Sequence, residues 1–152
     1  MPARQPATPA LAVSVIPIRK GQGPSLDVFV QHRAKTMDFA ADVVVFPGGR
    51  VDPEDYAPPQ DEPIISELVL DRQVTAWART SIAEPGPGRT RDLARALLRC
   101  GRREVHEETG LNLEPEDLIP WANWVTPPDL PKRFDTYFFV AQIRKGQHLA
   151  HQ

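Results

Sequence analysis

The segment RREVHEETGL, residues 102–111, constrains the fold of this chain more than any other stretch. It completes a run, residues 91–110, whose apolar and small residues recur with the period of an amphipathic helix. Those residues are Ala94, Leu98, Gly101 and Val105. Asp92 is a candidate N-cap, and Gly110 followed by Leu111 fits a C-cap with a left-handed glycine. We therefore predict a long helix with one side anchored in a core.

Three glutamates share the opposite side of this predicted helix. Successive helical residues turn by about 100°, so Glu107 lies about 60° to one side of Glu104 and Glu108 about 40° to the other. Like charges at these spacings cost a few tenths of a kcal/mol per pair. One interpretation is an acidic face in solvent. The other is a site for a hard divalent cation such as Mg²⁺, which prefers oxygen ligands and would turn the repulsion into attraction.

The stretch REVHEETGL resembles the second half of the Nudix box, whose pattern is G-x(5)-E-x(7)-R-E-U-x-E-E-x-G-U with U apolar. All fixed positions of that half match, at Arg103, Glu104, Val105, Glu107, Glu108, Gly110 and Leu111. The first half of the box resembles FPGGRVDPED, residues 46–55. Counting from Gly49 puts Asp55 where the pattern has glutamate, whereas counting from Gly48 puts Glu54 there. We favour Asp55, because family members usually count from the second glycine.

The two halves of this box lie unusually far apart. Residues 56–102 stand where the pattern has seven residues, so about 40 are inserted. The Nudix branch that includes peroxisomal coenzyme A diphosphatases has a long insertion here and a later run similar to PKRFDTYFF, residues 131–139. The resemblance, over roughly residues 11–143, is closest to that branch. We expect the insertion, at about 56–92, to carry a helix near Ile64 to Ala78 that forms a lid beside the site.

The rest of the chain is typical of β-strands joined by turns. The expected strands are residues 11–19, 26–33, 43–51, 118–127 and 133–143, the third of them buried. Strands around one strong helix indicate an α/β or α+β domain. The resemblance implies the Nudix fold, a mixed β-sheet sandwiched with the box helix.

We expect this Nudix hydrolase domain to occupy residues 10–152, after a flexible tail at 1–9. Only nine residues follow Ile143, so we expect the C-terminal strand and helix of the fold to be lacking. A truncated product, or a partner chain such as the second copy in a homodimer, would explain that.

The resemblance also implies a chemistry, the hydrolysis of a diphosphate linked to another moiety with Mg²⁺ or Mn²⁺ as cofactor. It implies Glu107 and Glu108 as metal ligands and Glu104 as either a further ligand or the general base. Gly48 is expected to offer its backbone carbonyl to the metal, since a glycine turn allows close approach. Arg103 is expected to hold the glutamates through charge-assisted hydrogen bonds.

Further residues are candidates for binding the substrate, although packing or solvation would explain each of them as well. The candidates for phosphate are Arg33, Arg50 and Arg133, and those for stacking on a base are Trp121, Trp124 and Phe134. His106 points away from the glutamates and lacks the second histidine of a zinc motif. Cys100 has no partner base, so we expect both residues to be structural.

Composition narrows the classes of function. A chain of 152 residues, 41% of them hydrophobic and 25% charged, fits one soluble globular domain. A net charge of −2 gives no electrostatic reason to bind nucleic acid or an anionic membrane. No apolar run approaches the roughly 20 residues that span a bilayer, and one cysteine fits the reducing cytoplasm.

Two hypotheses about function follow. One is a metal-dependent diphosphatase acting on a coenzyme A-type, ADP-ribose-type or related nucleotide. The other is a catalytically weak or inactive Nudix-fold module with a ligand-binding or regulatory role.

Overall fold

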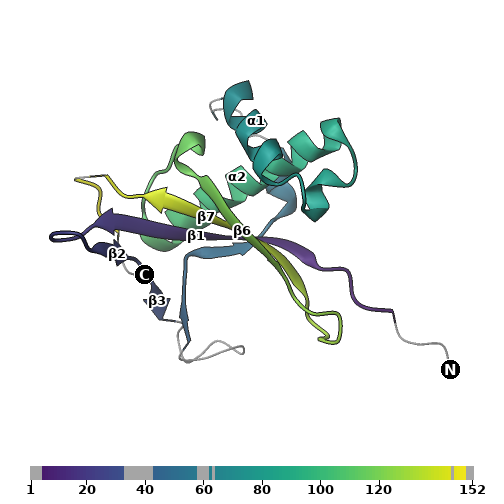
Figure 1. Cartoon of the computed structure of the whole chain (residues 1–152), viewed down its shortest axis with the longest axis horizontal. Helices are drawn as coiled ribbons and strands as arrows, with labels where there is room; N and C mark the ends of the chain where they lie inside the picture. The colour runs from purple at the N-terminus through teal and green to yellow at the C-terminus, as the bar shows by residue number, and fades with distance from the viewer. Residues whose placement is uncertain (1–4, 33–42, 58–61, 63, 145, 150–152) are drawn as a thin grey trace.

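The computed structural model describes residues 5–32, 43–57, 62, 64–144 and 146–149. A five-stranded mixed sheet lies at the centre of the molecule, and two helices lie beside it (Figure 1). The strands of this sheet are β1 (Ala10–Lys20), β2 (Leu26–Val28), β5 (Gly48–Arg50), β6 (Ile119–Val125) and β7 (Phe134–Gln142). Two short strands, β3 (Gln31–His32) and β4 (Val44–Val45), pair with each other.

Strand β1 organises the sheet. The strand order is β2-β1-β7-β6, and β5 pairs with residues 12–14 of β1 while β2 pairs with residues 18–20. Strands β1 and β7 run parallel from the pair Ala10–Phe134 to the pair Ile18–Gln142, whereas the other pairs are antiparallel. Gly48 and Gly49, the first residues of β5, are therefore fixed against β1, an inner strand of the sheet.

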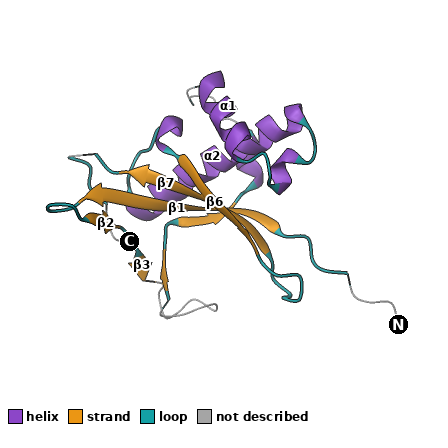
Figure 2. Ribbon diagram, viewed as in Figure 1, coloured by secondary structure: helices purple, strands orange, loops and turns teal. Residues whose placement is uncertain are grey.

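One face of the sheet is buried and the other is partly open. Alternate residues of β7 are fully buried, at Asp135, Tyr137, Phe139 and Ala141. Val13 and Val15 of β1 belong to the same core. This alternation is expected of a strand that packs one face, and the helices lie on one side of the sheet (Figure 2).

Helix α2 spans Pro87–Thr109 and begins earlier than predicted. Gly86 precedes it, and Pro87 suits a first turn because no N–H is needed there. Asp92 is therefore not the N-cap; its carboxylate accepts a hydrogen bond from Arg95 at 3.1 Å. The C-terminal prediction is confirmed, since Gly110 is left-handed with φ 77°.

The described part of the insertion belongs to the core. The predicted helix is present as α1 (Glu67–Ala76), followed by a 3₁₀ turn, η2 (Ser81–Ala83). Buried side chains of the insertion include Leu70, Trp77 and Ile82. The Trp77 ring meets the rings of Tyr137 and Phe139 edge-on, at centroid distances of 5.0 and 5.6 Å. The structure does not support the predicted lid, because α1 packs against α2 and none of its residues lines the cleft described below.

Two other expectations need correction. The stretch 43–51 was predicted as a buried strand that runs into a Pro-Gly-Gly turn. It is instead split into β4 and β5, Val43 and Val44 are exposed, and Gly48 and Gly49 are paired residues of β5. The stretch 26–33 is likewise split into β2 and β3. Beyond β7 the described residues add no further helix or strand. In the same described part of the chain, no helix combines the length and apolar character that crossing a membrane requires.

Candidate active site

The three glutamates lie on the C-terminal half of α2, next to Gly48 and Gly49 at the start of β5. Glu108 Oε2 accepts a hydrogen bond from the backbone N–H of Gly48 at 2.9 Å. The Glu104 carboxylate packs against Gly49 so closely that a Cβ there would lie 2.5 Å from its Oε1. The glycine pair therefore allows two carboxylates to reach the main chain.

Gly48 is constrained by the strand behind it. A Cβ at Gly48 would lie 2.2 Å from the carbonyl oxygen of Val13 in β1. The N–H of Val15 donates to the carbonyl of Pro47 at 2.8 Å. In an antiparallel pair, alternate residues point their N–H and C=O groups away from the partner strand, and Gly48 is such a residue. The N–H of Gly48 is bonded to Glu108, and by this register its carbonyl also points away from β1.

Arg103 binds carboxylates from both halves of the box. Its Nε and Nη2 donate to the two carboxylate oxygens of Asp55, at 3.0 and 2.9 Å. Its Nη1 donates to Glu104 at 3.0 Å and to Glu107 at 3.3 Å. The hydrogen bond to Asp55 raises the pKa of Arg103, which therefore stays charged. Two more carboxylates within ion-pair distance are Asp52 and Glu54.

The structure places Asp55, rather than Glu54, in the buried contact with Arg103. Asp55 lies in a 3₁₀ turn, η1 (Pro53–Tyr56), and is only 3% exposed. Its Oδ2 also accepts the N–H of Asp52 at 2.8 Å and so caps the turn. Glu54 is exposed, and its Oε1 lies 3.6 Å from Nε of Arg103. The turn brings the short aspartate to the arginine, where a bidentate pair forms.

The glutamates differ in their surroundings. Burial raises the pKa of Glu104 above its ordinary value, although the hydrogen bond from Arg103 opposes that shift. A more basic carboxylate is better suited to accept a proton near neutral pH. Glu107 is exposed and Glu108 is half-buried, and both line a cleft.

This cleft measures about 590 Å³ and lies mainly on the sheet face away from α2. Its floor includes Ala12, Ser14 and Thr136, which alternate along their strands with residues buried under the helices. Phe46 and Phe134 add apolar surface. Small side chains on the floor and carboxylates at one side leave room for a ligand with a flat apolar part and a charged part.

Of the six candidates for binding the substrate, Arg50 and Phe134 line this cleft. Trp124 does not; its side chain is 71% exposed and its ring lies 5.6 Å from that of Phe138. Arg33 lies outside the described residues.

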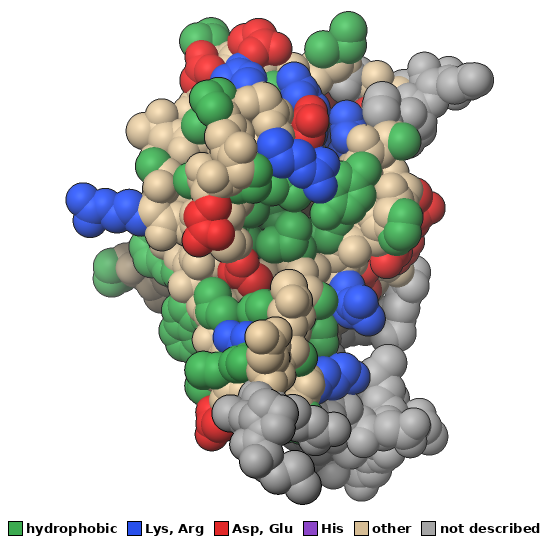
Figure 3. All heavy atoms as spheres, turned by 90° about the vertical axis from the view of Figure 1, so that its right-hand side faces the viewer, with side chains coloured by type: hydrophobic (Ala, Val, Ile, Leu, Met, Phe, Trp, Pro, Cys, Tyr) green, Lys and Arg blue, Asp and Glu red, His purple; other side chains and the backbone are tan. Residues whose placement is uncertain are grey.

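Neither of the two remaining candidates, Arg133 and Trp121, lines the cleft. Arg133 donates to the carbonyls of Thr126, at 3.0 Å, and Ala7, at 2.6 Å, so it holds the β6–β7 hairpin. Trp121 is exposed. Exposed apolar side chains are also visible in the middle of the face shown in Figure 3.

Sequence reasoning missed Gln31 and His32, which line the cleft from β3. Gln31 Nε2 donates to the backbone carbonyl of Glu108 at 3.4 Å. These two residues immediately precede Arg33, which was a candidate for binding phosphate. The position of Arg33 at the end of a predicted strand was therefore the only sequence signal that pointed to them.

Cys100 and His106 lie next to the glutamates in sequence but show no catalytic arrangement. Cys100 is buried, with Sγ near the carbonyl oxygens of Gly49, at 3.7 Å, and Arg50, at 3.5 Å. Burial raises the pKa of its thiol, so the nucleophilic thiolate is disfavoured. His106 is exposed, and its carbonyl accepts the N–H of Gly110 in the C-cap.

The donor set fits a hard divalent cation. Three carboxylates and an outward-facing backbone carbonyl are oxygen donors of the kind that Mg²⁺ and Mn²⁺ prefer. Among the described residues, no three His, Cys, Asp or Glu side chains are already grouped to hold a metal. Glu104 and Glu107 instead share Nη1 of Arg103. Their carboxylates would therefore have to turn from Arg103 to bind a cation.

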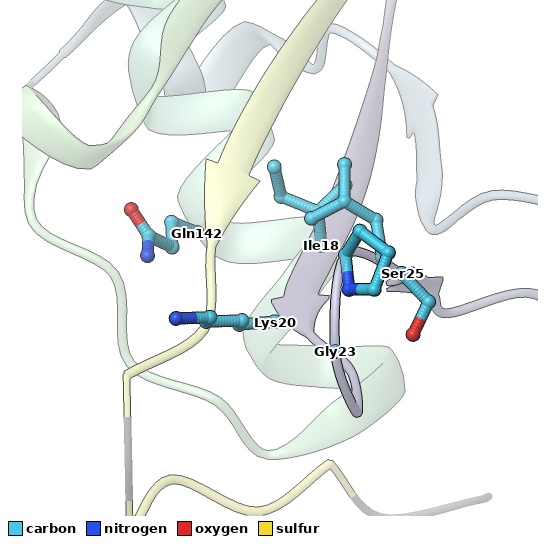
Figure 4. Close-up of a pocket in the computed structure, with 7 residues that line it drawn as sticks. Ile18, Lys20, Gly23, Ser25 and Gln142 are labelled. Atoms are coloured by element: carbon cyan, nitrogen blue, oxygen red, sulfur yellow. The ribbon is translucent and has the colours of Figure 1, made fainter.

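A smaller hollow of about 330 Å³ lies at the turn between β1 and β2 (Figure 4). Ile18 and Lys20 of β1 and Gln142 of β7 contribute to its lining, which contains no carboxylate. This hollow lies near the C-terminal end of β1, whereas the residues of β1 that pair with β5 are residues 12–14. The acidic cluster and its cleft therefore form the candidate site.

No protein-family model and no curated protein sequence matches this chain. Solved structures do match it. A NUDIX hydrolase from Alicyclobacillus acidocaldarius aligns with a TM-score of 0.60 and 26% identity, over 94% of this chain and 72% of the other. A MutT/nudix family protein from Enterococcus faecalis gives 0.57 and 17%, over 99% and 42%. The C. elegans Ap4A hydrolase gives 0.52 and 11%, over 95% and 76%.

The similarity to these structures is one of overall fold. The chain has the Nudix fold, as predicted from its sequence. Its structural neighbours include Nudix hydrolases, which supports a place in that superfamily. They do not assign the branch of coenzyme A diphosphatases.

Proposed function

We propose that this chain is a metal-dependent hydrolase that cleaves the diphosphate linkage of a nucleoside diphosphate joined to another moiety. One observation carries the proposal: Glu108 and Glu104 of α2 contact Gly48 and Gly49 at the start of β5, and Glu107 and Glu108 line the cleft beside these glycines. The volume of that cleft is within the range of small-molecule sites, about 300–1,000 Å³. The similarity to Nudix hydrolases supports hydrolysis of such a bond at the level of the fold.

The cofactor in this proposal is Mg²⁺ or Mn²⁺. Glu107 and Glu108 would hold it, with the Gly48 carbonyl and, in one version, Glu104 as further ligands. A divalent cation bound there neutralises diphosphate oxygens and lowers the pKa of a bound water. In the other version, Glu104 is the general base, which its burial beside Gly49 favours.

Residues around the cleft would bind the rest of the substrate. Arg50, on the rim, can donate two hydrogen bonds to phosphate oxygens. Phe134 offers an aromatic face to a nucleobase. The substrate is a coenzyme A-type, ADP-ribose-type or related nucleotide, and the insertion together with PKRFDTYFF favours the coenzyme A-type.

The full chain should be assayed with ADP-ribose, coenzyme A, NADH, a nucleoside triphosphate and diadenosine tetraphosphate, with Mg²⁺ or Mn²⁺. The last of these is included because one structural neighbour is an Ap4A hydrolase. Products are followed by chromatography. We expect at least one substrate to be cleaved, and Glu107→Gln to lower that rate about 100-fold.

Glu84→Gln is the matched control, because Glu84 is exposed in the insertion, away from the cleft. It should leave the rate unchanged. Full activity in Glu107→Gln would show that the site assignment is wrong.

The second candidate function is a Nudix-fold module that binds a nucleotide-type ligand without cleaving it. The favouring observation is the shared contact of Glu104 and Glu107 with Arg103. Ligand binding by calorimetry in the presence of metal, with no turnover of any member of the panel, would support this candidate.

Three further expectations remain part of the proposal: a small-molecule partner rather than nucleic acid or a membrane, a homodimer, and a cytoplasmic location. The modest net charge supports the first. Light scattering of the purified full chain would distinguish one copy from two.

A further inference from the structure

A largely buried ion cluster joins the insertion to helix α2. Glu62, in the insertion, binds two arginines of that helix. Its Oε2 accepts a hydrogen bond from Arg99 Nε at 3.1 Å, and its Oε1 accepts one from Arg102 Nη1 at 2.7 Å. The side chains of Glu62 and Arg99 are each only 11% exposed. One carboxylate therefore neutralises and orients two guanidinium groups in a place where water reaches little of them.

Both arginines also hold main-chain segments. Arg99 Nη1 donates to the carbonyl oxygen of Asp55 at 3.0 Å. Arg102 Nε donates to the carbonyl oxygen of Leu113, just beyond the end of α2, at 2.6 Å. Each of these guanidinium groups therefore binds Glu62 and one main-chain segment. For Arg99 the segment is η1, and for Arg102 it is the stretch that follows α2.

The contact with Asp55 leads directly to the glutamates. Arg99 and Arg103 are four residues apart on α2 and so share a face of the helix. Arg99 holds the carbonyl of Asp55, and Arg103 holds its carboxylate. The η1 turn is therefore held at two points by successive turns of one helix.

We propose that Glu62 is a positioning residue for the carboxylate cluster. It fixes Arg99, Arg99 fixes η1 through the carbonyl of Asp55, and Asp55 holds Arg103, whose Nη1 orients Glu104 and Glu107. The inference rests on the function proposed above for these glutamates. It gives the insertion a part in shaping the site although none of its described residues lines the cleft.

Removing the charge of Glu62 should loosen this chain of contacts. Arg99 and Arg102 would be left as two like charges without their shared counterion in a poorly hydrated place. Arg99 would then turn toward solvent and release Asp55. With Asp55 released, Nε and Nη2 of Arg103 would be free to pair with Glu104 and Glu107, and these carboxylates would then turn less readily toward a cation. Changes in the residues that orient metal ligands typically cost about 10–100-fold in metal affinity or activity.

The test compares Glu62→Gln with Glu67→Gln in the full chain. Glu67 is the control because it is also an insertion carboxylate that pairs with an α2 arginine, Arg91, whose hydrogen bonds go to Glu67 and Asp71 of α1. Mn²⁺ affinity is measured by electron paramagnetic resonance, and kcat and KM on the substrate found above. We expect Glu62→Gln to weaken Mn²⁺ binding and lower kcat about 10-fold with little change in KM. Glu67→Gln should change none of these, and Glu62→Asp should restore part of the loss.

Arg99→Lys is the second variant, for use if Glu62→Gln fails to fold. Lysine keeps a positive charge beside Glu62, but its single ammonium group cannot replace a planar guanidinium that binds both Glu62 and the Asp55 carbonyl. We therefore expect the same loss of Mn²⁺ affinity and kcat. Equal effects of Glu62→Gln and Glu67→Gln, or unchanged Mn²⁺ affinity in Glu62→Gln and Arg99→Lys, would overturn the inference. If the unaltered chain binds Mn²⁺ without turnover, the proposed hydrolase fails while the positioning role is still judged on affinity; no Mn²⁺ binding overturns both.

Discussion

Helix α2 is held in different ways along its two halves. The first half is held mainly by apolar contacts, in a core that includes Leu93 and Leu97 of the helix and Trp77 of the insertion. From Arg99 onward the helix still buries Cys100 and Val105, but its arginines also bind carboxylates and main-chain carbonyls of other segments. Apolar packing depends on shape and volume, whereas hydrogen-bonded ion pairs fix direction. The first half should therefore set the stability of the domain, and the second half the geometry of the site.

The largest expected effect is on stability, from Trp77→Ala in the core that holds the first half of α2. The side chain is 4% exposed and packs on Tyr137 and Phe139, and its indole N–H donates to Gln73 Oε1 at 3.0 Å. We expect the free energy of unfolding to fall by about 3–5 kcal/mol, measured by urea denaturation. Trp121→Ala, at an exposed position, should change it by less than about 0.5 kcal/mol. Similar values for both would contradict a core role for the insertion.

The comparison is sharpened by alanine at each of the two adjacent glycines. At Gly48 the new Cβ would meet the fixed carbonyl of Val13, so we expect a loss of about 1–3 kcal/mol in unfolding free energy. At Gly49 it would meet the end of the Glu104 side chain, which can swing away. Gly49→Ala should therefore stay folded while kcat falls by as much as about 100-fold. Denaturation and steady-state kinetics on both variants measure the difference, and loss of stability without loss of kcat at Gly49 would argue against a placed Glu104.

The smallest expected effect is that of Asp71→Asn, in α1, whose partner Arg91 lies in the first half of α2. Asp71 accepts a hydrogen bond from Arg91 at 2.7 Å, and this contact raises the pKa of the arginine. Both groups are in contact with solvent, which screens such a pair. The urea midpoint and kcat should stay within experimental error of the unaltered chain. A fall in the midpoint comparable to that of Trp77→Ala would mean that charge also holds this half of the helix.

Local patterns predicted the parts of the fold that local physics decides. The period of the apolar residues placed the buried side of α2, and Gly110 marked its end, because a left-handed residue there favours glycine. The start of α2 was misplaced because Asp92 and Pro87 are both acceptable first-turn signals. The sequence alone does not choose between them.

Long-range contacts account for most of what the sequence did not predict. Counting the box favoured Asp55 over Glu54, but the pairing of Asp55 with Arg103, 48 residues away, was not predicted and is seen only in the fold. The lid was expected because both ends of the insertion attach to the box. That reasoning overlooked its apolar residues, which lower the free energy more by joining the core. Glu62 gave no local sign of its partners, which lie on a helix far along the chain.

The parallel pair of β1 and β7 has a consequence for how the protein folds. Every pair in that ladder joins residues 124 positions apart, from Ala10–Phe134 to Ile18–Gln142. Contacts of such long sequence separation form late, because the intervening chain must lose its freedom first. On a ribosome, β1 therefore emerges early and has to wait, with one edge unpaired, until residue 142 has been released. Chaperone binding to β1 and premature aggregation would compete with folding during that interval.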